Sequence, residues 1–85
     1  MRTASESTTP EQLGFFGRAA KELRRERGLE VEEFVVRAGL SIRHVLLLEG
    51  GRVNEGFDIL CRLADALGVG LDSLFRRMEA IGGGR

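Results

Sequence analysis

The fold is decided by a short segment, Arg37-Ala38-Gly39-Leu40-Ser41, which separates two runs of apolar residues at helical spacing. Gly39 follows the last periodic residue of the first run, where many helices end in a left-handed backbone conformation that glycine adopts without steric cost. Leu40 then supplies an apolar side chain for the core, and Ser41 is a preferred N-cap residue for the next helix. The segment therefore predicts two short helices joined by a tight corner.

Both helices beside this corner are expected to be short. The first run predicts a helix over about residues 31–38, and the second predicts a helix over about residues 42–49, which ends at Gly50 and Gly51. One face of the second helix is expected to point inward, and the opposite face to project outward. The residues expected to be buried in the two helices are Phe34, Val35, Ala38, Val45 and Leu48.

A longer helix is expected before this pair, over about residues 10–27. At its start, Thr9 and Gln12 have the spacing of a capping box, in which each side chain bonds to the backbone N–H of the other residue. Gly14 and Gly17 lie inside this helix. Each of them costs about 1 kcal/mol relative to alanine, or else allows another helix to approach closely.

Two more helices are expected after the pair, at about residues 55–67 and 71–80, and Asn54 is a suitable N-cap for the first of them. There is no strand pattern and no internal repeat. The sequence therefore predicts an all-α protein, a compact bundle of five helices. The inward residues of the helix at 55–67 are expected to be Phe57, Leu60, Leu63, Ala64 and Leu67.

One folded domain accounts for the length of 85 residues. This domain is expected to span residues 10–81. Residues 1–9 are small and polar without apolar periodicity, and residues 82–85 are mostly glycine, so both ends are expected to be flexible tails.

The composition excludes several classes of site and protein. Thirteen basic and thirteen acidic residues cancel, so the net charge does not by itself predict a nucleic-acid partner. One cysteine, Cys61, and one histidine, His44, offer neither a disulfide framework nor a metal site. No nucleophile and base, phosphate loop or membrane span is recognisable. We therefore expect a cytoplasmic protein that is not an enzyme, has no catalytic residues and needs no metal or cofactor.

The order of these motifs resembles a known family, the phage-repressor-like helix-turn-helix domains of the Cro and cI, or Xre, type. The resemblance extends from residue 16 to residue 75, about two thirds of the chain. It implies a lambda-repressor-like bundle with a central helix-turn-helix, and a sequence-specific DNA-binding transcriptional regulator. The matching motifs are Phe16-Gly17, Leu23-Arg24, Arg27-Gly28-Leu29, Glu32-Glu33-Phe34, Arg37-Ala38-Gly39-Leu40-Ser41, Leu48-Glu49, Gly51, Leu60, Leu63-Ala64, Ala66-Leu67-Gly68-Val69, Leu71 and Leu74-Phe75.

The resemblance also implies which residues contact double-stranded DNA. The helix at 42–49 is expected to lie in the major groove, and the start of the preceding helix and the segment after the groove helix are expected to contact phosphates. The positions implied at the bases are Ile42, Arg43, His44, Leu46 and Leu47, and those at the phosphates are Val31, Arg37, Ser41 and Arg52.

Some of these positions depart from the family pattern. Val31 stands where the family usually has a glutamine that bonds to the DNA backbone, and valine offers no donor. Leu46 and Leu47 replace small polar or basic residues, and a carboxylate at Glu55 would repel DNA if it faced the phosphates. Glu49 is expected to be structural instead, in an ion pair with an arginine such as Arg24.

The apolar outward residues leave two interpretations open. Ile42, Leu46 and Leu47 either contact thymine methyl groups in the groove or form a patch that binds a protein partner, with DNA recognition lost. A homodimer is also expected, because one short recognition helix seldom supplies enough affinity alone. The expected dimer interface comprises Leu74, Phe75, Met78 and Ile81.

Overall fold

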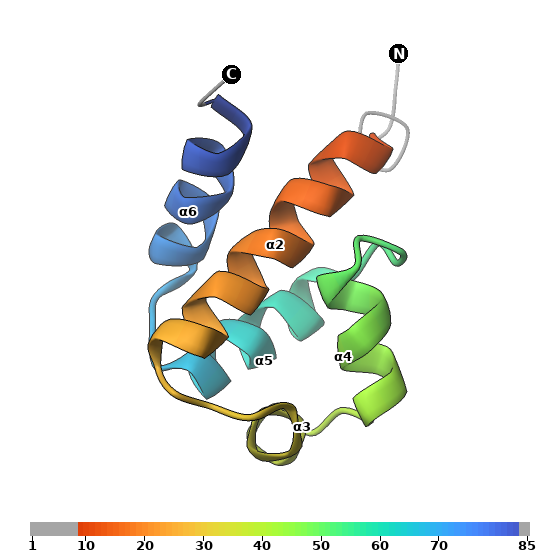
Figure 1. Cartoon of the computed structure of the whole chain (residues 1–85), viewed down its shortest axis with the longest axis vertical. Helices are drawn as coiled ribbons and strands as arrows, with labels where there is room; N and C mark the ends of the chain where they lie inside the picture. Colours follow the sequence, from red (N-terminus) through yellow and green to blue (C-terminus); the bar gives the residue numbers. More distant parts are fainter. Residues whose placement is uncertain (1–8, 84–85) are drawn as a thin grey trace.

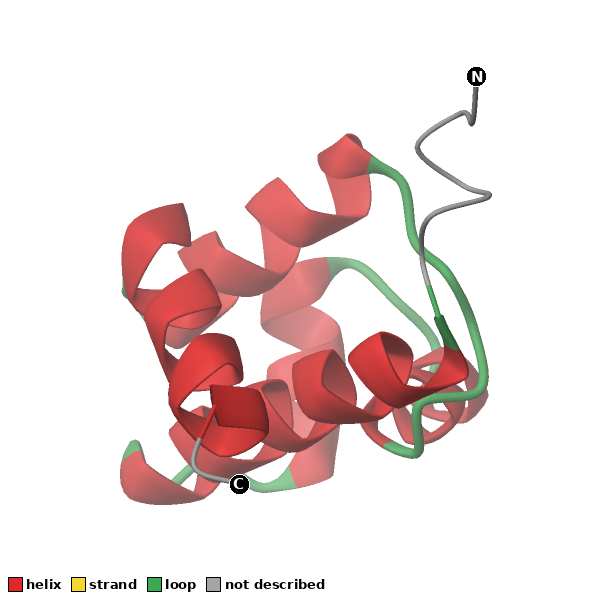
Figure 2. Ribbon diagram, turned by 90° about the horizontal axis from the view of Figure 1, so that it is seen from above, coloured by secondary structure: helices red, strands yellow, loops and turns green. Residues whose placement is uncertain are grey.

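Five helices make up most of the chain that the computed structural model describes, residues 9–83 (Figure 1). Within these residues there is no strand, so the expected all-α bundle is confirmed. Short loops connect the helices (Figure 2). Of the expected tails at residues 1–9 and 82–85, residues 1–8 and 84–85 lie outside the described residues. In chain order the helices are α2 (Pro10–Glu26), α3 (Val31–Ala38), α4 (Ile42–Glu49), α5 (Phe57–Leu67) and α6 (Leu71–Gly83).

The corner between α3 and α4 forms as the sequence predicts. Gly39 has φ of 71°, in the left-handed region, and the backbone N–H of Leu40 donates to the carbonyl of Val35 at 3.0 Å. The hydroxyl of Ser41 accepts a bond of 3.0 Å from the N–H of His44, which caps α4. Local hydrogen bonds thereby help to fix the angle between the two helices, together with their packing in the core.

The core lies where α2, α3, α4, α5 and α6 meet. All five residues expected to be buried in α3 and α4 are buried. Helix α2 is the central element, with α6 and α4 packed against it and placed on opposite sides in Figure 1. The largest fully buried side chains are Phe34, Val45, Leu48, Leu63, Leu67 and Leu74.

Helix α5 begins later than expected. Gly56, rather than Asn54, is its N-cap, and its first residue is Phe57. The prediction that Phe57 faces the core is wrong, since 69% of its surface is exposed. Because the helix starts at this position, the Phe57 side chain stands at the end of the helix, and the residues that pack against the core begin at Ile59 and Leu60.

Helix α6 continues further than expected, through Gly82 and Gly83, which were assigned to the C-terminal tail. The reason is its packing on α2. Gly82 is buried against the ring of Phe15, so closely that a Cβ at this position would come within 2.6 Å of Phe15 Cδ2. Glycine therefore allows the last turn of α6 to remain against the first turns of α2, despite its low helix propensity.

Arg77 adds a polar link between the same two helices. It donates to the carboxylate of Glu26 at 2.6 and 3.0 Å and to Glu22 at 3.3 Å. The hydrogen bond from Arg77 lowers the pKa of Glu26 from its ordinary value. This link is largely solvent-exposed, so it aligns the helices more than it stabilises them.

Gly17 allows α2 and α4 to approach each other. A Cβ at this position would lie 2.3 Å from the carbonyl oxygen of Leu48 and 2.7 Å from that of Glu49. Both obstacles are backbone atoms of α4, which cannot rotate away as a side chain can. Of the two explanations considered for the glycines of α2, close approach therefore holds at Gly17. At Gly14 a Cβ would meet nothing within 4 Å.

The contrast between these two glycines yields a prediction. Gly17→Ala should lower the free energy of unfolding by about 1–3 kcal/mol or more, because α4 has to move away from α2. Gly14→Ala should raise it by up to about 1 kcal/mol, since alanine favours the helix and fits without contact. Urea denaturation followed by circular dichroism measures both. Equal effects of the two substitutions would show that the close approach at Gly17 is unimportant.

Candidate nucleic-acid interface

Helix α4 is fixed at both ends. Ser41 caps its start, and the N–H of Arg52 donates to the carbonyl of Leu47 at 2.8 Å beyond its end. Gly51 makes this C-terminal turn possible with φ of 72°. An eight-residue helix is marginal alone, so these caps and its packing hold it in shape.

A buried ion pair attaches α4 to α2. Arg24 Nε donates to Glu49 Oε2 at 2.7 Å, and Arg24 Nη2 donates to Glu49 Oε1 at 3.2 Å. The two side chains are only 8% and 5% exposed. The hydrogen bond to Glu49 raises the pKa of Arg24 above its ordinary value, against the effect of burial. The expected pairing of Glu49 with Arg24 is thus confirmed.

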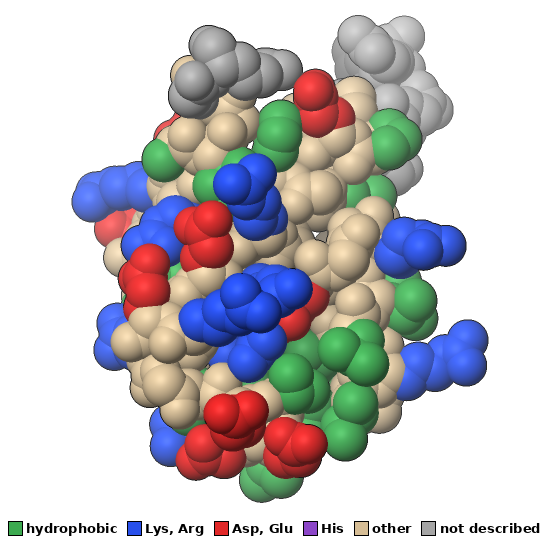
Figure 3. Space-filling view, viewed as in Figure 1, with side chains coloured by type: hydrophobic (Ala, Val, Ile, Leu, Met, Phe, Trp, Pro, Cys, Tyr) green, Lys and Arg blue, Asp and Glu red, His purple; other side chains and the backbone are tan. Residues whose placement is uncertain are grey.

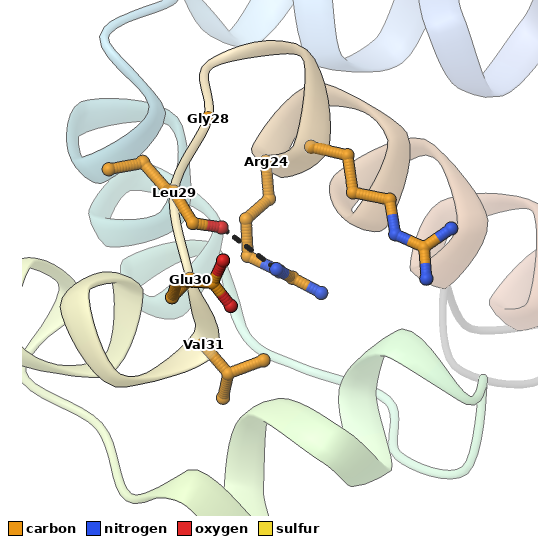
Figure 4. Close-up of a pocket in the computed structure, with 6 residues that line it drawn as sticks. Arg24, Gly28, Leu29, Glu30 and Val31 are labelled. Atoms are coloured by element: carbon orange, nitrogen blue, oxygen red, sulfur yellow. Dashed lines mark hydrogen bonds between the residues drawn. The ribbon is translucent and has the colours of Figure 1, made fainter.

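The same arginine also holds the start of α3. Its Nη1 donates to the carbonyl of Leu29 at 2.9 Å, across a hollow of about 300 Å³ between the end of α2 and α3 (Figure 4). Figure 4 also shows that Glu30 and Val31 follow Leu29 along the wall of this hollow. A single side chain therefore joins α2, α4 and the segment before α3.

The outward face of α4 carries more apolar than polar surface. Ile42 is 46% exposed and Leu46 is 55% exposed, whereas Leu47 is half-buried. Arg43 is exposed on the same helix. Basic side chains project from the side of the molecule on which α4 lies, with hydrophobic side chains beside them (Figure 3). The face expected to contact bases is therefore accessible and carries both apolar and basic side chains.

His44 is directed differently from its neighbours on α4. Its Nε2 contacts the carboxylate of Glu55, in the loop before α5. The histidine side chain is 33% exposed and that of Glu55 only 10%. Sequence reasoning missed this contact, because the two residues are eleven positions apart and not on one helix. The pairing also means that Glu55 does not present a bare carboxylate to solvent.

The positions expected to contact phosphates differ in exposure. Arg37, Ser41 and Arg52 are exposed, and Val31 is half-buried against the core. Among residues 9–83, no ion pair or side-chain hydrogen bond involves Arg37, Arg43 or Arg52. Their guanidinium groups therefore have no acidic partner within the described chain to compete with a phosphate.

The dimer interface expected on α6 requires a correction. Leu74 is fully buried, with 0% exposed, so it belongs to the core of one chain and not to a contact between chains. Phe75 is 39% exposed, and Met78 and Ile81 are half-buried at the edge of the core. An apolar surface remains on α6, but it is smaller than the sequence pattern indicates.

The described residues contain neither a metal-binding cluster nor a membrane-spanning helix. No three His, Cys, Asp or Glu side chains within 9–83 are placed so that they hold a metal ion together. In the same range, none of the helices has both the length and the apolar character needed to cross a bilayer.

Comparison with known proteins places this arrangement in a family. A family model described as a helix-turn-helix domain matches residues 16–78. The chain belongs to the helix-turn-helix domain family. Its α3 and α4 are the two helices of the motif, and the Gly39 corner is its turn.

Two curated relatives share this helix-turn-helix sequence. The transcriptional regulator DdrOP3 of Deinococcus deserti is 34% identical over 62 residues, which cover 73% of this chain and 48% of that protein. The uncharacterised regulator y4dJ of Sinorhizobium fredii is 49% identical over 47 residues, which cover 55% of this chain and 61% of that one. The matches thus span about half of one relative and three fifths of the other.

Two solved structures resemble the helix-turn-helix bundle. The restriction-modification controller protein C.AhdI of Aeromonas hydrophila has a TM-score of 0.72 and 33% identity, covering 74% of this chain and 96% of that one. The clp gene regulator ClgR of C. glutamicum has a TM-score of 0.77 at 21% identity, covering 85% and 91%, and supports the fold alone.

The buried pair of this helix-turn-helix domain leads to a second prediction. Glu49→Leu should lower the free energy of unfolding by about 3–5 kcal/mol, because Arg24 is left buried without its counterion. The double variant Arg24→Met with Glu49→Leu should recover much of this loss. Thermal denaturation measures both variants, and Arg76→Met, which breaks an exposed pair with Asp72, is the control, with an expected change below about 1 kcal/mol. A double variant no more stable than Glu49→Leu would contradict this account.

Proposed function

We propose that this protein is a transcriptional regulator that binds double-stranded DNA with α4 in the major groove. The observation that carries the proposal is the exposed outward face of α4 on a helix-turn-helix frame, flanked by arginines without acidic partners in the described chain. The names of DdrOP3 and y4dJ, which describe transcriptional regulators, support it. The alternative, a protein-interaction module, has no such support.

Each exposed arginine has a distinct proposed role. Arg43, in the first turn of α4, contacts the O6 and N7 atoms of a guanine. Arg37, Arg52 and the hydroxyl of Ser41 contact phosphates and set the register on the duplex. Val31 contributes only apolar contact there, since it has no donor side chain. A regulator with these roles acts by binding DNA and needs no catalytic step. Because it must reach the DNA, we propose a cytoplasmic location.

The acidic residues nearest to α4 do not oppose this role. Glu49 is buried against Arg24, and Glu55 is largely covered and contacts His44. Both carboxylates are thus largely shielded from the phosphates. The contact with Glu55 also changes the role expected of His44, which we propose is to hold α4 against the following loop rather than to contact a base.

We also propose a homodimer formed through α6. Phe75 is the most exposed apolar residue there, and Met78 and Ile81 continue the surface at helical spacing. A symmetric dimer presents two recognition helices about one turn of DNA apart, so that two weak contacts act together.

The DNA-binding role is tested with duplexes enriched from a random pool by the purified protein. Binding to the enriched duplex should weaken as salt rises, because arginines displace condensed counterions. Arg43→Ala should weaken binding about 5- to 150-fold and relax the preference at one base pair. Arg52→Ala should weaken all duplexes alike and reduce the salt slope by about 1. Fluorescence anisotropy at two salt concentrations measures these effects.

The matched control is Arg76→Ala. This arginine is exposed on α6, away from α4 in Figure 1, and should leave affinity and salt slope unchanged. If no duplex is enriched, or if Arg43→Ala binds as well as the natural chain, the proposed role of α4 is wrong.

The homodimer is tested by sedimentation equilibrium. Phe75→Glu should shift the mass toward that of one chain, because it places a charge in an apolar contact. Val36→Glu is the control, since Val36 is also apolar and is 80% exposed, but lies on α3. A natural chain that sediments as a monomer at every concentration would exclude the dimer.

A further inference from the structure

Half of the eight side chains of α4 are already engaged within the protein. Val45 and Leu48 are buried in the core, Glu49 is paired with Arg24, and His44 contacts Glu55. Val45, Leu48 and Glu49 therefore have no free group with which to contact a base edge, and one ring nitrogen of His44 is already engaged. The outward face of the helix consists of what remains, namely Ile42, Arg43, Leu46 and Leu47.

Only one of these four residues carries hydrogen-bonding groups. The Arg43 guanidinium donates hydrogen bonds, while Ile42, Leu46 and Leu47 offer hydrocarbon alone. An apolar side chain placed against a polar base edge removes water from that edge without replacing its hydrogen bonds, which is unfavourable. In the major groove, the one apolar group on a common base is the C5-methyl of thymine. The same methyl group is present in 5-methylcytosine.

We infer that α4 recognises C5-methyl groups of pyrimidines next to a guanine contacted by Arg43. This inference rests on the proposed DNA-binding function and specifies the half-site. Ile42 and Leu46 are four residues apart on one face of the helix, about 6 Å along its axis. With the helix along the groove, this distance corresponds to about two base steps of 3.4 Å. The half-site therefore has methyl groups on both sides of the Arg43 contact.

Charge favours DNA over a protein as the occupant of this apolar face. Arg43 on the helix and Arg52 just after it are exposed and have no acidic partner among residues 9–83. Glu49 on α4 and Glu55 in the loop that follows it are turned into the protein. A surface with apolar side chains between unpaired arginines complements methyl groups that lie between rows of phosphates.

The test replaces single methyl groups on the enriched duplex. Deoxyuridine in place of thymine removes only the methyl group, and 5-methylcytosine in place of cytosine adds only that group. At contacted positions, loss of a methyl should weaken binding about three- to five-fold, and gain should strengthen it similarly. A loss on the first replacement identifies thymine as the source of the methyl group, and a gain on the second identifies methylated cytosine. Either result supports the inference.

A variant assigns the effect to α4. At the base pair contacted by Leu46, Leu46→Ala should bind the thymine and deoxyuridine duplexes almost equally, because the side chain that contacts that methyl is gone. Since Leu46 is 55% exposed, this variant should fold, and its thermal midpoint verifies that it does. Val36→Ala, also exposed and apolar but on α3, should keep the full difference between the duplexes.

Failure of the inference and failure of the proposed function give different results. Sequence-specific, salt-dependent binding that ignores both base replacements overturns the inference and leaves the DNA-binding function intact. The absence of binding to any duplex overturns both. Self-association that Leu46→Ala abolishes, without DNA binding, also overturns both and assigns the face to a second copy of the chain.

Discussion

The contact between Arg24 and Glu49 governs the placement of α4. One guanidinium bonds to both carboxylate oxygens and to the carbonyl of Leu29, with the pair almost fully shielded from water. Burying two charges has a desolvation cost that only good geometry offsets, so the pair tolerates little change in the separation of its helices. It therefore acts as a constraint on orientation more than as a source of stability.

Gly17 imposes a second constraint on the same pair of helices. The backbone of α4 passes so close to this position that no side chain fits between them. Together, the ion pair and the glycine fix the distance and the direction of α4 relative to α2. The outward residues of α4 take part in neither contact. Substitutions of these residues therefore leave the placement of α4 against α2 unchanged. The proposed recognition and the folding contacts thus lie on different faces of one helix.

Local patterns in the sequence were sufficient to predict the corner, the caps and the inward residues of α3 and α4. The pairing of Arg24 with Glu49 was also foreseeable, since the sequence of α4 places a carboxylate where only a basic partner makes burial acceptable. Leu74 was assigned to the wrong surface, because helical spacing identifies an apolar stripe without showing whether it covers its own core or another chain. The contact of Glu55 with His44 has no local signature, as it joins a helix to an irregular loop.

The inward direction of Glu49 and Glu55 bears on how strongly a regulator with the proposed function is attracted to DNA that is not its target. A chain with a formal net charge of zero has little general attraction to the many DNA segments that are not its target. Under the proposed function, contacts from Arg37, Arg43 and Arg52 would displace only about three counterions, which gives weak attraction to random sequence. In that proposal, occupancy of the target DNA sequence depends mainly on the contacts between α4 and the bases. Less of the protein is then bound to non-specific DNA.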